Sequence, residues 1–301
     1  KKGNVVVVAN FPPKVYRLSP NGTVEFVLEN PPFLFPGDIA IDETGDYIIT
    51  DPWISGTHAV YRITPSGELI KKFSGPFIQP NNIAIDKLGR YVITDSSARG
   101  VFVIEPKSGE ITKLVDLSFY PRTLTIYGDD FILGGDYNTI YKVSSKGQTE
   151  LLATLDDNIF IGETVLDNYG NIIVAADRVF MEESYFSKSE AVMLAITKDK
   201  KVHELGRFPG FGDISSVAIV GSLNVMNLTI PMFPSPMGKV KVLLRHPAEG
   251  GIWGVSTSSD GKYVAAAEFS RWGEEFGAVH VFQTFPVPTH LWTYRTPHLM
   301  R

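Results

Sequence analysis

Hydrophobic positions in this chain form short runs separated by tight polar turns. In residues 38–51 an apolar run is followed by a polar turn and by a second apolar run that ends at Asp51. Residues 82–95 repeat this pattern and end at Asp95. The two copies start 44 residues apart, so the sequence indicates an internal structural repeat.

The acid or amide that ends the second run marks each copy of the repeat. Successive markers are 41 to 50 residues apart. The markers are Asn10, Asp51, Asp95, Asp136, Asp177, Asn227 and Glu268. Counted from the turn glycine, the acids in the fifth and seventh copies fall one place later than Asp51 and Asp95, which predicts a bulge or a shifted strand end.

Each copy continues into two more strand-like runs. In the second copy these runs are residues 59–64 and 68–73, joined by Pro65-Ser66-Gly67. Proline fixes φ for a turn and glycine supplies a positive φ, so this joint predicts a hairpin. Four short strands per copy, with almost no helical periodicity, predict an all-β fold: a seven-bladed β-propeller of four-stranded antiparallel blades. A β-sandwich would not need one period repeated seven times.

We expect a single propeller domain over residues 1–301. The expected blades are approximately residues 1–35, 36–78, 79–119, 120–160, 161–211, 212–249 and 250–301. The first blade is expected to be incomplete, because only residues 1–4 precede its second strand. We expect Leu299–Arg301 to start the missing strand, with the rest supplied by residues outside this sequence or by a neighbouring subunit, since an exposed inner edge would leave backbone groups unpaired.

Composition narrows the range of functions. The net charge of −5 argues against nucleic-acid binding, because no basic stripe exists to neutralise phosphates. The absence of cysteine excludes disulfides, thiolate metal sites and cysteine nucleophiles. No apolar run reaches the roughly 18 residues of a transmembrane helix. We expect a secreted or cell-surface protein, with a cytoplasmic one as the alternative.

The loops between the second and third strands of the blades are long and rich in aromatic residues, whereas the turns on the opposite face are mostly tight. These loops are expected to include residues 52–54, 178–186, 231–237 and 269–276. Long loops on one rim of a rigid scaffold are where binding usually occurs. The alternative is that these aromatic side chains only pack on neighbouring blades. The candidate partner-binding or ligand-binding residues are Trp53, His58, Phe180, Tyr185, Phe186, Phe233, Trp272 and Phe276.

The residues that open the first strands are expected to meet at the channel mouth on the same face. Asp38, Asn82, Glu163 and Asp213 supply carboxylate and amide oxygens there, with Arg122 beside them. Oxygen ligands without thiol or imidazole suit Ca²⁺. In the alternative interpretation each acid caps its own loop or pairs with Arg122. The repeated marker aspartates are most simply structural caps of the following loop.

Catalytic motifs are absent from the sequence. It has no Gly-x-Ser-x-Gly elbow, no P-loop and no His-Glu-x-x-His. His58 is the one histidine in a long loop of this kind, so it is the conceivable general base; a lone surface histidine is more often only solvated.

Residues 38–51 and 80–95 resemble NHL repeats and are similar to the corresponding segments of SMP-30/gluconolactonase propellers. Residues 254–268, with 291–294, look more like a WD40 or PQQ-type blade. The NHL resemblance implies binding of protein or nucleic acid. The SMP-30 resemblance implies a Ca²⁺-dependent lactonase with Glu, Asn and Asp ligands, which Glu163, Asn82 and Asp213 would supply. That family also has a glutamate in its first inner strand, and this chain lacks that strand.

Two functions therefore remain open from the sequence. The first is a non-enzymatic propeller that binds a protein or small ligand through its long-loop face. The second is a metal-dependent lactonase or esterase with its site at the channel mouth.

Overall fold

The computed structural model of the chain shows an all-β protein. It describes residues 5–10, 13–19, 24–29, 31–52, 58–136, 138–167, 170–182, 185–209, 252–257, 263–268, 276–283 and 289–297. Every regular element in these ranges is a strand. Accordingly, these ranges contain no helix long and apolar enough to cross a membrane.

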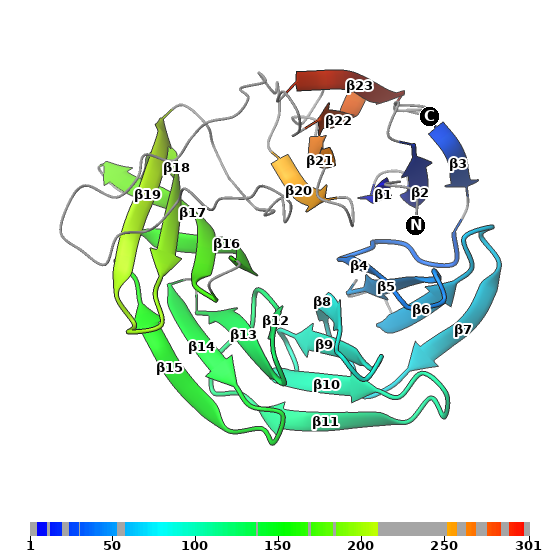
Figure 1. Ribbon diagram of the computed structural model, residues 1–301, viewed down its shortest axis with the longest axis horizontal. Coiled ribbons are helices and arrows are strands. Elements are labelled where there is room, and N and C mark those ends of the chain that lie inside the picture. Colours follow the sequence, from blue (N-terminus) through cyan, green and yellow to red (C-terminus); the bar gives the residue numbers. More distant parts are fainter. Residues whose placement is uncertain are drawn as a thin grey trace. The chain divides into compact units, whose positions relative to one another are not determined.

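The described strands form antiparallel sheets in which consecutive strands are neighbours (Figure 1). The chain divides into two compact units, one of residues 6–17 and 24–155, the other of residues 156–301 with 1–5 and 18–23.

The first unit holds a three-stranded sheet and three four-stranded sheets. Their strands are β1 (Val5–Asn10), β2 (Pro13–Leu18) and β3 (Val24–Glu29); β4 (Ile39–Ile41), β5 (Tyr47–Asp51), β6 (Ala59–Ile63) and β7 (Leu69–Ser74); β8 (Pro80–Ile85), β9 (Tyr91–Asp95), β10 (Gly100–Ile104) and β11 (Ile111–Asp116); and β12 (Thr125–Tyr127), β13 (Asp130–Gly135), β14 (Thr139–Val143) and β15 (Thr149–Thr154). Within the described residues the first sheet has three strands. Residues 1–4 and the predicted start of a fourth strand at Leu299–Arg301 lie outside the described residues, so the incomplete first blade stays a prediction.

The second unit holds two further four-stranded sheets. Their strands are β16 (Ile159–Leu166), β17 (Ile172–Glu182), β18 (Tyr185–Ile196) and β19 (Val202–Pro209); and β20 (Ile252–Thr257), β21 (Tyr263–Glu268), β22 (Phe276–Gln283) and β23 (Thr289–Pro297). The predicted sixth blade, residues 212–249, lies outside the described residues. The four-stranded antiparallel blade is therefore confirmed, and the number seven stays a prediction.

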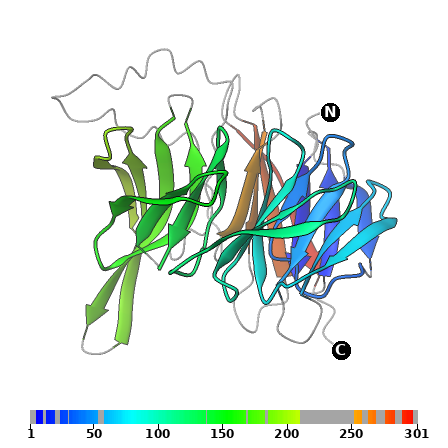
Figure 2. The same cartoon turned by 90° about the horizontal axis from the view of Figure 1, so that it is seen from below.

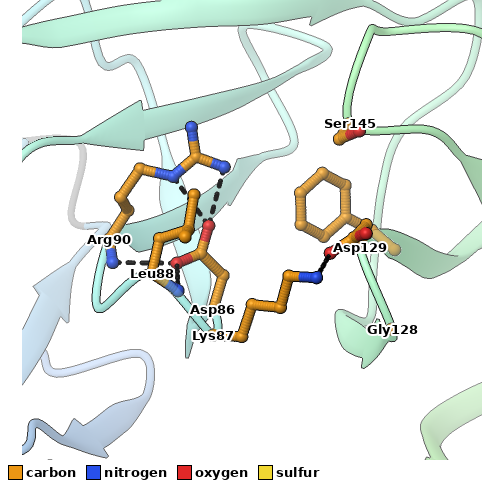
Figure 3. Close-up of a pocket in the computed structure, with 8 residues that line it drawn as sticks. Asp86, Lys87, Leu88, Arg90, Gly128, Asp129 and Ser145 are labelled. Carbon is orange, nitrogen blue, oxygen red and sulfur yellow. Dashed lines mark hydrogen bonds and ion pairs between the residues drawn. The ribbon is translucent and has the colours of Figure 1, made fainter.

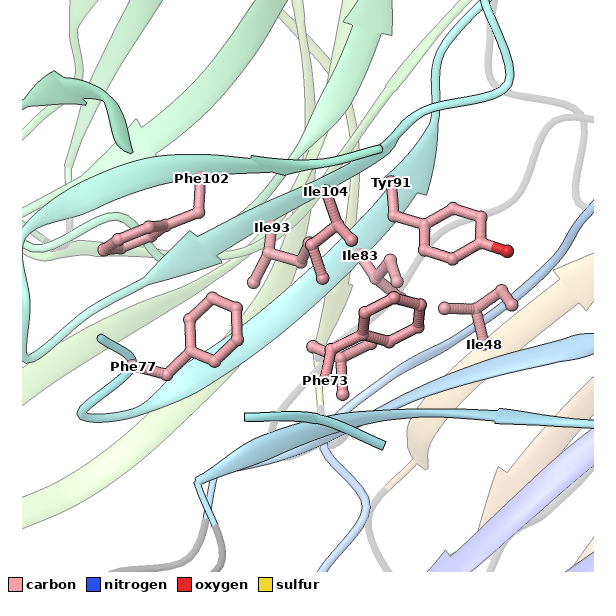
Figure 4. Packing of buried hydrophobic residues seen from close by; sticks show 9 residues of the cluster. Ile48, Phe73, Phe77, Ile83, Tyr91, Ile93, Phe102 and Ile104 are labelled. Atoms are coloured by element: carbon pink, nitrogen blue, oxygen red, sulfur yellow. The ribbon is translucent and has the colours of Figure 1, made fainter. Parts of the chain in front are cut away.

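Buried side chains join successive sheets in the first unit. Every residue of β5, β9 and β10 is buried, because both faces of these strands are covered, whereas the outer strand β7 is mostly exposed. One cluster joins Ile48 and Phe73 of one sheet to Ile83 and Tyr91 of the next (Figure 4). Burial of apolar area at about 25 cal/mol per Å² makes these clusters the main source of stability.

The tight turns repeat their hydrogen bonds from blade to blade. In the turn between β4 and β5, Asp42 N–H donates to the Asp46 carbonyl and Asp42 Oδ1 accepts from the Thr44 and Asp46 amides. Asp86 binds the amides of its own turn in the same way. The glycine of each turn has a positive φ, +92° at Gly45, which side chains rarely adopt.

Register shifts occur in the first strand of three sheets. β16 shifts against β17 between Ile161 and Glu163, β20 shifts against β21 between Ile252 and Gly254, and β8 shifts against β9 between Pro80 and Asn82. In each pair the extra residue lies in the first strand, whereas the sequence predicts an extra place in the second strand, between the turn glycine and the acid. These bulges therefore do not explain the later position of the acids in the fifth and seventh copies, and the predicted bulge is not confirmed.

The expectation of a long loop at residues 178–186 is wrong. β17 continues through Asp177 to Glu182, and β18 begins at Tyr185, so this segment is a hairpin ribbon (Figure 2). Arg178 pairs with Glu190 in the ladder and its guanidinium binds the Glu190 and Glu204 carboxylates at 3.2 and 3.1 Å. β17 continues five residues past Asp177, which therefore does not end its strand.

Candidate functional site

Three connections in the first unit share one geometry. Each runs from an outer strand, or from the three-stranded sheet, to the first strand of the next sheet, and each contains a buried phenylalanine. Phe33, Phe77 and Phe119 are at most 6% exposed. Each ring packs on an aromatic ring of the third strand of the sheet it enters. The pairs are Phe33–Tyr61, edge to face at 5.9 Å; Phe77–Phe102, edge to face at 5.3 Å; and Phe119–Tyr141, stacked at 3.9 Å.

The residue after each buried phenylalanine is large, apolar or aromatic, and exposed. Leu34 is 47% exposed, Ile78 is 53% exposed and Tyr120 is 48% exposed. We call these three residues the apolar stripe. They occupy equivalent positions in three successive connections, each directly after its buried phenylalanine.

The marker aspartates hold the backbone of the apolar stripe. Asp95 accepts hydrogen bonds from the amides of Ile78 at 2.7 Å and Gln79 at 2.9 Å. Asp51 accepts from Leu34 at 3.1 Å, and Asp136 accepts from Tyr120 at 3.1 Å.

The hydrogen bonds of Asp95 show which backbone segments a marker aspartate caps. Asp95 also accepts from Ala98 in the loop after its strand at 2.7 Å, which is the expected loop cap. Its other two bonds run to the connection that enters the sheet, so the cap joins two segments. Burial, reinforced by the Asp51 carboxylate, raises the pKa of Tyr61 to about 12, so this tyrosine stays protonated beneath Leu34.

Arg99 lies against the exposed ring of Tyr120. Its guanidinium carbon is 4.1 Å from the ring centroid, and it donates a hydrogen bond to the Tyr120 hydroxyl. The Arg99 backbone has a φ of 45°, and its carbonyl accepts from Leu117 N–H at 2.7 Å. A non-glycine residue at positive φ costs free energy and is enriched at functional sites.

The polar residues at the starts of β4 and β8 lie on the same side of their sheets. Asp38 is partly exposed and its two carboxylate oxygens accept from Ile39 N–H at 2.7 Å and Ile83 N–H at 3.0 Å. It therefore links two neighbouring blades. Burial raises the pKa of Asp38 to about 6, although both backbone hydrogen bonds oppose this shift.

A hydroxyl and amide network continues beside Asp38. Thr50 donates to the Asn81 carbonyl at 2.8 Å, and Asn81 Nδ2 donates to Ser96 Oγ at 3.1 Å. Asn82 Oδ1 accepts from the Thr94 hydroxyl at 3.2 Å. Asn81 Oδ1 is buried without a hydrogen-bond partner among the described residues.

The predicted metal ligands accept hydrogen bonds from backbone amides. Glu163 accepts from the amide of Thr164 within β16 at 3.2 Å, and Asp38 accepts from the amide of Ile39 at 2.7 Å. The metal site and its alternative, loop capping, both stay predictions. Arg122 is exposed, and its amide donates to the Gly134 carbonyl at 2.8 Å. Asp213 lies outside the described residues. Within the described part of the chain, no three or more His, Asp or Glu side chains form a group that could hold a metal ion.

The predicted aromatic residues are only partly covered by the structure. Phe180 is 37% exposed on the ribbon of β17. Tyr185 starts β18 and Phe276 starts β22, so neither lies in a loop. His58 is partly buried, and its Nδ1 has no hydrogen-bond partner among the described residues. Trp53, Phe233 and Trp272 lie outside the described residues.

A shallow pocket of about 280 Å³ lies on the opposite, tight-turn side of the same unit (Figure 3). Its charged groups satisfy one another: Arg90 pairs with Asp86 at 2.7 Å, and Lys87 pairs with Asp129. The pocket therefore offers a ligand few polar groups that are not already engaged, and the apolar stripe is the stronger candidate.

Sequence reasoning missed the apolar stripe. The signal was available, because Phe followed by Leu, Ile or Tyr recurs before the first strand of each of the three sheets. The marker pattern drew attention to strand ends instead of to the connections that those ends hold.

No family model matches this sequence, and no curated protein matches it. Solved structures do. Virginiamycin B lyase from Staphylococcus aureus matches at 12% identity over 100% of this chain and 86% of that one, with a TM-score of 0.52. A nidogen/laminin complex matches at 14% identity over 98% and 94%, with a TM-score of 0.58.

The chain has a β-propeller fold. A catalytically inactive virginiamycin B lyase from S. aureus with quinupristin also matches, at 14% identity over 89% of this propeller and 74% of that chain, with a TM-score of 0.57. Identities this low show the fold alone, so the resemblance to NHL repeats and SMP-30 propellers stays a prediction.

Proposed function

We propose that this propeller is a binding module that docks a protein partner on the apolar stripe. The observation that carries the proposal is the repetition: three equivalent connections each expose one large side chain over a buried aromatic pair. Exposed apolar residues scattered singly need no explanation, but a set that recurs at equivalent positions of three connections supports an interaction surface.

Rigidity supports the same proposal. The amide of each stripe residue is bound by a carboxylate of its own sheet, so the side chains are fixed before a partner arrives. A preorganised surface loses little conformational entropy on binding, and central aromatic residues carry much of the binding energy at interfaces. The nidogen/laminin complex, which is an assembly of proteins, contains the same fold.

A pair of triple variants tests the proposal. Leu34→Ser, Ile78→Ser and Tyr120→Ser together remove the stripe. Leu69→Ser, Leu88→Ser and Leu151→Ser form the matched control, because these are apolar residues of the same unit with similar or greater exposure. Peptides are first selected on the wild-type protein from a random library displayed on phage.

We expect the stripe variant to bind the selected peptides at least about tenfold more weakly, and the control to bind them like the wild type. Fluorescence anisotropy gives the dissociation constants, and circular dichroism verifies that both variants are folded. Equal loss in both triple variants would contradict docking on the stripe.

A second candidate function, a metal-dependent lactonase or esterase, is favoured by Asp38. A carboxyl with a pKa near 6 exists in both protonation states near neutral pH, as a general acid or base requires. The propeller of virginiamycin B lyase, an enzyme by its name, has the same fold. The test compares the melting temperature and the rate of hydrolysis of simple lactones between protein with added Ca²⁺ and protein with chelator. The second function predicts that Ca²⁺ raises both. If Ca²⁺ neither raises the melting temperature nor supports lactone hydrolysis, this second function is wrong.

A further inference from the structure

We infer that the partner segment recognised by the apolar stripe is acidic, and that Arg99 and Tyr120 together bind one of its carboxylates. This inference rests on the proposed function and adds the chemistry of the partner. It starts from charge: Arg99 is exposed, and its guanidinium binds the Tyr120 ring and hydroxyl, with no carboxylate partner among the described residues.

The acidic groups around Arg99 are engaged elsewhere. The Asp95 carboxylate is buried under three amides, and Asp136 binds the amide of Tyr120. Asp116 pairs with Lys113. The Arg99 guanidinium therefore forms no ion pair with a carboxylate in the described part of the protein.

The geometry suits a carboxylate. A guanidinium stacked on an aromatic ring keeps its edge N–H groups free to donate in the plane, and that plane matches a carboxylate. The backbone of Arg99 is fixed at positive φ and tied to Leu117, so the guanidinium is held in place before binding. Ile78 and Leu34 continue the surface with apolar contacts. An extended peptide with acidic and apolar residues matches both features.

The test uses two fluorescein-labelled peptides, one of alternating Glu and Leu and one of alternating Gln and Leu. We expect the wild-type protein to bind the Glu peptide about tenfold more tightly than the Gln peptide at low ionic strength. High salt should reduce this preference, because partly exposed charges are screened.

Substitutions locate the preference. Arg99→Gly accepts the positive φ and removes the guanidinium, and it should bind both peptides equally. Lys107→Gly is the matched control: it removes one positive charge from an exposed turn and should retain the preference. Tyr120→Phe keeps the aromatic ring on which Arg99 stacks, and this variant should retain most of the preference for the Glu peptide.

The outcomes separate the two proposals. If the wild-type protein binds both peptides equally and the stripe triple variant loses both, the docking surface stands and the acidic partner is wrong. If Arg99→Gly retains the preference for the Glu peptide, Arg99 does not provide it and the inference fails. If the wild-type protein binds neither peptide, the inference is likewise overturned.

Discussion

Single carboxylates convert the connections of this protein into a fixed surface. Asp95 is fully buried, yet its oxygens accept three backbone amides from two different segments. A buried amide cannot be left without an acceptor at low cost, so the side chain and both segments form one unit. The short Asp side chain places its oxygens close to the end of the strand, where those amides converge.

Removing the Asp95 carboxylate should lower the stability of the protein by more than the loss of one hydrogen bond. Asp95→Ala leaves three amides without their acceptor, and each unsatisfied group costs about 1–3 kcal/mol, so we expect a loss of at least about 3 kcal/mol. Asp129→Ala is the control, because its exposed ion pair contributes little. Urea denaturation measures both. A loss below about 1 kcal/mol for Asp95→Ala would contradict this role.

Asp38 predicts a pH dependence of opposite sign to that of most carboxylates. Its pKa is raised from 3.8 to about 6, so the native state retains a proton that the unfolded chain releases. This contribution to stability is present below pH 3.8 and is lost as pH rises through about 6. At about 1.4 kcal/mol per unit it amounts to at most about 3 kcal/mol.

The measurement compares urea denaturation of the wild type and of Asp38→Asn, which cannot titrate. The wild type should lose stability relative to the variant between pH 4 and pH 7. A constant difference across this range would show that the Asp38 carboxyl does not titrate there.

At the scale of elements, the hairpin turns show how one geometry tolerates different residues. Thr64 and Ser144 each open a turn whose glycine, Gly67 or Gly147, has a positive φ and donates back to the opening residue. Thr197 opens the same turn before β19, but Lys200 stands at the glycine position with a φ of 62°. The hydrogen bonds of the turn therefore hold a lysine in a conformation that strains it.

Relieving this strain should stabilise the turn. Lys200→Gly removes the steric cost of a side chain on a left-handed backbone, which is about 1–2 kcal/mol. Glycine also adds conformational freedom to the unfolded chain, which offsets part of this gain. We therefore expect the free energy of unfolding to rise by about 0.5–1 kcal/mol. Gly147→Ala should do the reverse, because its Cβ would lie 2.8 Å from the Leu114 carbonyl oxygen. Urea midpoints report both. Destabilisation by Lys200→Gly would disprove the strain.

At the scale of the whole molecule, we predict one domain. Three of the four tryptophans are Trp253, Trp272 and Trp292, so in a Trp53→Phe variant fluorescence reports only on the second unit. Circular dichroism reports on the strands of both units. A single propeller domain should unfold cooperatively, with coincident urea transitions by the two probes. A fluorescence midpoint clearly displaced from the dichroism midpoint would indicate two separately folding domains.

The sequence determined the elements of this protein because strands and turns are local. Alternating apolar runs, turn glycines and the repeated acid predict the four-stranded blade, and the structure has it. The bulges in β8, β16 and β20 were not predicted, because an extra residue in the first strand does not change the spacing from the turn glycine to the acid of the second strand. The residues 178–186 were misread as a loop, because a ribbon that continues past its sheet has no end signal in the sequence.

Tertiary structure alone decided the candidate site. Leu34, Ile78 and Tyr120 are ordinary apolar residues in the sequence, and they become a surface only because Phe33, Phe77 and Phe119 take the buried positions beside them. Which of two adjacent apolar residues turns inward depends on the aromatic ring of a distant strand and on a carboxylate that holds the intervening amide. The aromatic ring and the carboxylate lie far along the chain from the two apolar residues. The local sequence pattern therefore cannot specify which of the two residues is exposed.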